Sequence, residues 1–133
     1  MKYLLDVNVL VAWGWEDHSA YDRAGRWIAE ASVVHSGMLF TSAIPQMGFV
    51  RVSVQRSSGQ IIPSEAGERL RNMLSALGEK HRFIPDDQES LVWPAWCFTA
   101  SRTTDAHLLA LAEAHGAKLA TLDSGIPGAF MIP

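Results

Sequence analysis

Short apolar runs alternate along the chain with longer stretches in which hydrophobic residues recur at helical spacing. The apolar runs have the length and composition of buried strands, and they lie at residues 3–5, 38–41, 83–84, 118–122 and 129–132. The stretches with helical spacing lie at residues 20–31, 44–54, 66–77 and 105–115. This alternation of strands and helices favours an α/β fold with a central, mostly parallel sheet.

The stretch from Gln88 to Ser101 is the hardest part of the chain to interpret. Pro94 lies in its middle and would kink or restart a helix there. The apolar residues around it nevertheless predict a helical segment whose side chains are buried. These residues are Leu91, Val92, Trp93, Ala95, Trp96 and Phe98.

The composition is that of an ordinary globular domain. Hydrophobic residues make up 48% and charged residues 19% of the 133 residues, which excludes disordered and low-complexity classes. A chain of this length suits one hydrophobic core, so we expect residues 1–133 to form a single domain. The net charge is −3, so any chemistry on nucleic acid would need a metal or a partner to offset electrostatic repulsion.

Cysteine content and hydropathy bear on the compartment. Cys97 is the single cysteine, which excludes an internal disulfide and a cysteine zinc cage and suits a reducing compartment. Asp6 and Asn8 interrupt the apolar start where a secretory signal would need an unbroken run, and no run approaches the roughly 18 residues that span a bilayer. We therefore expect a cytoplasmic protein with no membrane association.

Three aspartates are candidates for a metal site. Asp6 and Asp123 each follow a predicted strand, and Asp105 opens the helix that precedes the second of these strands. The carboxyl ends of parallel strands share one edge, so the three carboxylates would meet there. Such a cluster is ordinarily held by Mg²⁺ or Mn²⁺. The alternative is that Asp105 only caps a helix and that Asp6 and Asp123 only form turns.

Aromatic and histidine residues support this picture less directly. Trp27, Trp93 and Trp96 lie in apolar patterns and are expected in the core. Trp13 and Trp15 follow the first strand, where both burial and a place in an interface or substrate groove are open. His107 and His115 have no metal-ligand spacing and are expected on the surface of the last helix.

Four segments occur in an order and at spacings that characterise a known family. They are Leu4–Leu10 (LLDVNVL), Gly48–Val52 (GFVRV), Thr104–Ala112 (TDAHLLALA) and Leu119–Asp123 (LATLD). Together they resemble the motif blocks of PIN-domain ribonucleases, and most closely those of the VapC toxins of bacterial toxin–antitoxin pairs. The resemblance implies a three-layer α/β/α fold, an Mg²⁺- or Mn²⁺-dependent endoribonuclease, a homodimer, and inhibition by a cognate VapB-like antitoxin.

The family's site residues transfer onto individual positions. The resemblance assigns metal-binding and catalytic roles to Asp6, Asp105 and Asp123, and a supporting role to Asn8. Gln46 stands where similar sequences have a glutamate, and an amide neither carries negative charge nor takes up a proton as a base.

Two arginines are near the candidate site in the sequence. Arg51 and Arg102 are candidates for contacts with RNA phosphates, although an arginine in such a place is commonly part of a structural ion pair.

Two functions follow from these residues. The first is a VapC-type endoribonuclease that cuts RNA with metal held by the three aspartates. The second is a degenerate PIN domain that binds antitoxin or RNA without cleaving. The reason to consider it is Gln46, which replaces the family's glutamate.

Overall fold

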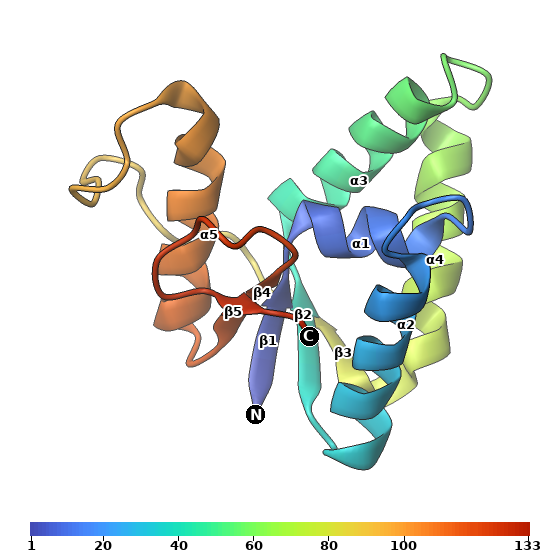
Figure 1. Cartoon of the computed structure of the whole chain (residues 1–133), viewed down its shortest axis with the longest axis horizontal. Coiled ribbons are helices and arrows are strands. Elements are labelled where there is room, and N and C mark those ends of the chain that lie inside the picture. Colours follow the sequence, from blue (N-terminus) through green and yellow to red (C-terminus); the bar gives the residue numbers. More distant parts are fainter.

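A five-stranded sheet forms the centre of the computed structural model, which describes all residues from Met1 to Pro133 (Figure 1). The strand order is β3-β2-β1-β4-β5, and every neighbouring pair is parallel. The strands are β1 (Lys2–Leu5), β2 (Met38–Thr41), β3 (His81–Phe83), β4 (Lys118–Thr121) and β5 (Phe130–Met131). The predicted parallel sheet is confirmed.

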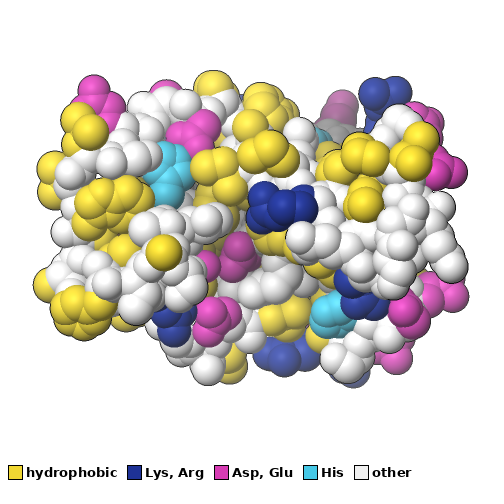
Figure 2. Space-filling model, turned by 90° about the horizontal axis from the view of Figure 1, so that it is seen from above, with side chains coloured by type: hydrophobic (Ala, Val, Ile, Leu, Met, Phe, Trp, Pro, Cys, Tyr) yellow, Lys and Arg dark blue, Asp and Glu magenta, His cyan; other side chains and the backbone are white.

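Helices cover both faces of this sheet, as the three-layer prediction required. Four lie on one face and α5 lies alone on the other (Figure 1). The helices are α1 (Val7–Gly14), α2 (Tyr21–Ala29), α3 (Ala43–Arg56), α4 (Pro63–Leu77) and α5 (Thr103–Ala114), with a π-helical turn at Glu30–Val34 and 3₁₀ turns at Gly78–Lys80 and Ala100–Arg102. None of the helices combines the length and the apolar character needed to cross a membrane. The carboxyl ends of the strands open at the top of Figure 1, the side that Figure 2 shows.

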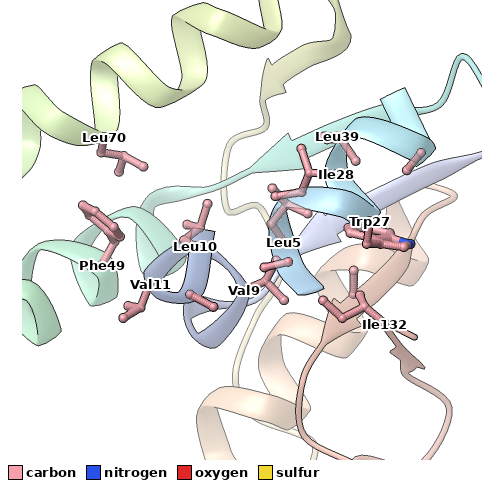
Figure 3. Close-up of a cluster of buried hydrophobic side chains, with 14 residues drawn as sticks. Leu5, Val9, Leu10, Val11, Trp27, Ile28, Leu39, Phe49, Leu70 and Ile132 are labelled. Atoms are coloured by element: carbon pink, nitrogen blue, oxygen red, sulfur yellow. The ribbon is translucent and has the colours of Figure 1, made fainter. Parts of the chain in front are cut away.

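Alternate residues of the strands build two separate cores. Leu5 and Leu39 pack with α1 to α4, and Figure 3 shows them among the side chains of Val9, Trp27 and Ile28. Residues one position away face the other side, since successive strand side chains point to opposite faces. Leu4, Phe40 and Leu119 accordingly pack with α5.

Helix α1 was not predicted, although it positions one side of the candidate site. Its four central residues, from Val9 to Ala12, are all buried, so the hydrophobic pattern has no polar face to reveal the helix. The helix packs very closely on α3, because a Cβ at Gly14 would lie only 2.7 Å from the ring of Phe49. A side chain at Gly14 would separate the two helices.

The prediction of a buried helix over Gln88–Ser101 is wrong. The segment is an irregular loop that becomes helical only at the 3₁₀ turn at its end. Leu91, Val92 and Phe98 are 78%, 92% and 88% exposed. Pro94 removes a backbone donor from the middle of the segment, and α5 already covers this face of the sheet with its own leucines.

The two open tryptophan placements are resolved in favour of packing. Trp13 and Trp15 both pack against the core that contains α1 to α4. The indole N–H of Trp15 donates to Ser53 Oγ at 2.8 Å, and the guanidinium of Arg69 lies 4.0 Å above its ring. Trp27 is in the core as predicted.

Candidate active site at the carboxyl edge of the sheet

The three predicted aspartates all reach the carboxyl edge of the sheet. Strands β1 and β4 are neighbours, so Asp6 at the end of β1 lies beside the segment from Thr121 to Asp123 that ends β4. Asp105 lies in the first turn of α5. A surface hollow at this edge is lined in part by Asp6 and Asp105, and Figure 2 shows acidic side chains recessed there beside basic ones.

Asp6 is held by two donors in a buried position. It is 4% exposed, and its Oδ1 accepts a 2.7 Å hydrogen bond from the backbone N–H of Val7, which caps α1. Its Oδ2 accepts a 2.8 Å hydrogen bond from the hydroxyl of Thr121. Two donors and a buried location fix the direction of this carboxylate.

Asn8 and Thr121 connect α1 to the end of β4. The amide of Asn8 donates to Thr121 Oγ1 at 3.1 Å, and its carbonyl oxygen accepts from the backbone N–H of Leu122 at 3.0 Å. Asn8 therefore ties the start of α1, next to Asp6, to the end of β4. Sequence reasoning missed Thr121; its only signal was a hydroxyl two residues before Asp123 in an otherwise apolar strand.

The candidate site contains three aspartates, and the pKa values of Asp6 and Asp105 reflect burial and repulsion between the carboxylates. Burial raises the pKa of Asp6, and the negative charges of Asp105 and Asp123 raise it further against the lowering effect of its hydrogen bonds. Burial also raises the pKa of Asp105, with Asp123 adding to the rise and Arg102 opposing it. The ionised carboxylates repel one another here, and a cation would stabilise them.

Arg102 is the cation that the structure places against two of these aspartates. Its Nη1 lies 3.3 Å from Asp105 Oδ2 and 3.2 Å from Asp123 Oδ2. Gly125 makes room for it, because a Cβ there would lie 2.5 Å from Arg102 Nη2. Arg102, a predicted phosphate contact, is thus engaged with the acids themselves.

A divalent cation fits the chemistry of this edge. As the side chains stand, no three acidic, histidine or cysteine residues converge closely enough to hold a metal ion. The guanidinium of Arg102 already occupies a cation position between Asp105 and Asp123, and the atoms facing it are carboxylate oxygens. Oxygen ligands of this kind suit Mg²⁺ or Mn²⁺.

Gln46 lies apart from the hollow that Asp6 and Asp105 line. Its amide donates to Thr41 Oγ1 at 3.0 Å, and the same hydroxyl lies 2.7 Å from His81 Nε2. Gln46 lines a second hollow, between α3 and α4. Next to Thr41, Ser42 precedes α3, but its buried hydroxyl has no hydrogen-bond partner and does not cap the helix.

Arg51 and the histidines of the α5 region differ in whether they have a charged partner. Arg51 is exposed at the hollow that Asp6 lines and forms no ion pair. Asp86 and Asp87 pair with His107 and His115 on α5, at 2.7 and 3.0 Å. The expected surface position of His107 is wrong: it is 9% exposed, because α5 turns it toward the loop that carries Asp86.

Comparison with known proteins gives concordant matches. The PIN domain family matches residues 3–128. The chain is 39% identical over 132 residues to Ribonuclease VapC39 of Mycobacterium tuberculosis, covering 95% of this chain and 91% of that protein. It is 35% identical to Ribonuclease VapC38 of the same organism, covering 92% and 86%.

A solved structure shares the fold. It is the crystal structure of VapBC2 from Rickettsia felis bound to a DNA fragment from their promoter. Its TM-score is 0.59 at 16% sequence identity, and the match covers 98% of this chain and 96% of that one.

Proposed function

The chain belongs to the PIN-domain family and, within it, to the VapC ribonucleases, and from this premise we propose that its carboxyl edge cleaves RNA phosphodiester bonds with a bound divalent cation. The observation that carries the proposal is the set of aspartates that β1, β4 and α5 bring to one edge around a cation position. The 39% identity to a ribonuclease over 95% of the chain favours this function over a degenerate, non-cleaving domain.

Asp6, Asp105 and Asp123 would hold the cation. The metal would supply charge neutralisation at the scissile phosphate and a bound water of lowered pKa. The chain's own contribution is orientation, since Val7 N–H and the Thr121 hydroxyl hold the Asp6 carboxylate in one direction. That fixed direction spares the site the cost of ordering a free carboxylate.

Arg51 would bind the RNA backbone. It is exposed beside the hollow and has no acidic partner, so its guanidinium is available for a phosphate. The net charge of −3 means that such local contacts, and the metal, must provide the attraction that the protein as a whole lacks.

The partner of this ribonuclease is a VapB-like antitoxin in our proposal. The support is the kinship with VapC ribonucleases and the shared fold with the VapBC2 structure. We also propose a homodimer, as the resemblance to the family implies. The antitoxin proposal is tested by expressing the chain with a short reading frame found beside its gene: co-purification and loss of cleavage support it, and independent purification with undiminished cleavage contradicts it.

Cleavage itself is tested by a single-turnover assay on purified cellular RNA with Mg²⁺ or Mn²⁺ and, separately, with a chelator. Cleavage should require the metal and disappear in Asp123→Asn. Asp87→Asn is the matched control, since it also removes one carboxylate but from the His115 pair. Cleavage that survives both the chelator and Asp123→Asn would refute the proposed site.

A further inference from the structure

Arg102 lies between Asp105 and Asp123, two of the acids that would hold the metal. The guanidinium makes one contact to Asp105 Oδ2 at 3.3 Å and one to Asp123 Oδ2 at 3.2 Å. Both contacts come from the same nitrogen, Nη1, which places positive charge between the two carboxylates. A cation bound to both acids would have to take this place.

We propose that Arg102 is an internal counter-cation that holds the metal-free site together and must leave Asp105 and Asp123 when a divalent cation binds. The proposal rests on the metal-dependent function proposed above. It makes metal binding an exchange of one cation for another, so the measured metal affinity is reduced by the strength of the Arg102 contacts.

The environment of Arg102 allows this exchange. Its side chain is 34% exposed, so the guanidinium has solvent to move into. It is also attached to the 3₁₀ turn at Ala100–Arg102, directly before α5, and not to the sheet. Movement of this side chain therefore leaves the strands that carry Asp6 and Asp123 undisturbed.

The resting position is nevertheless specific. Gly125 lies against the guanidinium, where a Cβ would come within 2.5 Å of Nη2, and the N–H of Gly125 donates to Asp123 Oδ1 at 2.7 Å. The Gly125 N–H thus helps to fix the Asp123 carboxylate, whose other oxygen contacts Arg102.

Arg51 provides a matched comparison. It is an exposed arginine at the hollow that Asp6 and Asp105 line, but it has no ion pair with Asp105 or Asp123. Arg51→Met and Arg102→Met change the net charge equally, from −3 to −4 when one positive charge is removed. Any difference between the two variants therefore reports the local contacts of Arg102 and not the overall field.

The first test measures Mn²⁺ affinity without RNA, from the signal of free Mn²⁺ in electron paramagnetic resonance. Arg102→Met should bind Mn²⁺ about fivefold or more tightly than Arg51→Met, which corresponds to about 1 kcal/mol for a partly exposed ion pair. A structural role alone predicts the opposite, since a disturbed site binds metal more weakly. Equal or weaker binding by Arg102→Met overturns the proposal.

The second test uses the parent protein and so does not depend on the folding of a variant. Mg²⁺ is added while the side-chain Nε–H signals of the arginines are followed by nuclear magnetic resonance, with Arg102→Lys identifying the signal of Arg102. That signal should move in step with Mg²⁺ saturation and return when a chelator is added. A signal that stays unchanged at saturation overturns the proposal.

The two tests separate this inference from the proposed function. If the parent binds Mn²⁺ and cleaves RNA but Arg102→Met binds no more tightly than Arg51→Met, only the role of Arg102 is wrong. If the parent binds no Mn²⁺ at all, the metal-dependent function and the role of Arg102 both fail.

Discussion

Two groups of carboxylates in this protein differ in how their charge is balanced. At the carboxyl edge, Asp6 has only neutral donors, and Asp105 and Asp123 share the single guanidinium of Arg102. In the loop after β3, Asp86 and Asp87 each have a histidine of their own on α5.

This difference in partners distinguishes the candidate active site from the two loop pairs, Asp86–His107 and Asp87–His115, which we call the tether. A hydrogen bond from each acid to its own imidazole fastens the loop to α5 and its C-terminal end. Three acids around one arginine keep negative charge that only a further cation can balance. We therefore expect substitutions in the loop pairs to change stability and substitutions at the edge to change metal binding.

The largest expected effect concerns position 46, whose side chain bonds to Thr41 at the end of β2 and lies outside the hollow that Asp6 and Asp105 line. Gln46→Glu restores a carboxylate where similar sequences have one, and should raise the single-turnover cleavage rate with Mn²⁺ by at least about tenfold and up to the roughly 10²–10⁴-fold that a general base contributes. Thr41, now a hydrogen-bond acceptor for the amide of Gln46, can donate to the new carboxylate. Equal measurable rates for parent and Gln46→Glu, with Asp105→Asn inactive, would place position 46 outside the chemistry.

Asp6→Asn tests whether the edge needs its buried charge for metal. A ligand that binds only the folded protein stabilises it by about 2.7 kcal/mol at 100 times its dissociation constant, so Mn²⁺ should raise the melting temperature of the parent. Asp6→Asn should abolish that rise. If Mn²⁺ does not change the melting temperature of the parent protein, the result contradicts a metal site.

The same substitution has a pH signature in the metal-free protein. Because the pKa of Asp6 is raised above 3.8, the folded protein binds a proton more readily than the unfolded chain. Stability therefore decreases as pH rises from 3.8 through the raised pKa, and Asp6→Asn should reduce this decrease and leave the part that comes from Asp105, whose pKa is also raised. Urea unfolding at several pH values measures it, and identical pH profiles for parent and variant would show that Asp6 is not the group responsible.

His107→Phe tests the tether, where the effect should fall on stability. The substitution removes the bonds to Asp86 and Ser90 and should lower the free energy of unfolding by about 1–3 kcal/mol. Asp86→Asn keeps an oxygen acceptor for His107 and should cost less, with cleavage by the folded protein near the parent rate. A cleavage defect in Asp86→Asn without a stability defect would abolish the distinction between the two groups.

The smallest expected effect concerns Asp87. This carboxylate is 52% exposed, and its hydrogen bonds to Gln88 and His115 hold its pKa below the ordinary value. Solvent screens such a pair, so Asp87→Asn should leave the melting temperature within about 1 °C of the parent. A larger loss, measured in the same thermal scan as the parent, would mean that the loop depends on this pair after all.

Local pattern was enough to predict the strands and the location of the aspartates at one edge of the sheet. The strand predicted before Asp6 and the one before Asp123 are neighbours in the sheet, as parallel pairing and right-handed crossovers required. Helix α1 was missed for a local reason, since burial from Val9 to Ala12 leaves no periodic polar face. Local pattern also failed over Gln88–Ser101, where apolar residues lie in an exposed loop.

What the sequence determined by itself was the five strands and four of the five helices, the family, and the chemical identity of the acids at the strand ends. Tertiary structure alone decided which side chain each acid contacts. Arg102 meets Asp105 three residues away but also Asp123 twenty-one residues away, and His107 reaches Asp86 across the same separation. Such contacts depend on how α5 is placed against the sheet, and that placement results from packing between segments that are far apart in the chain.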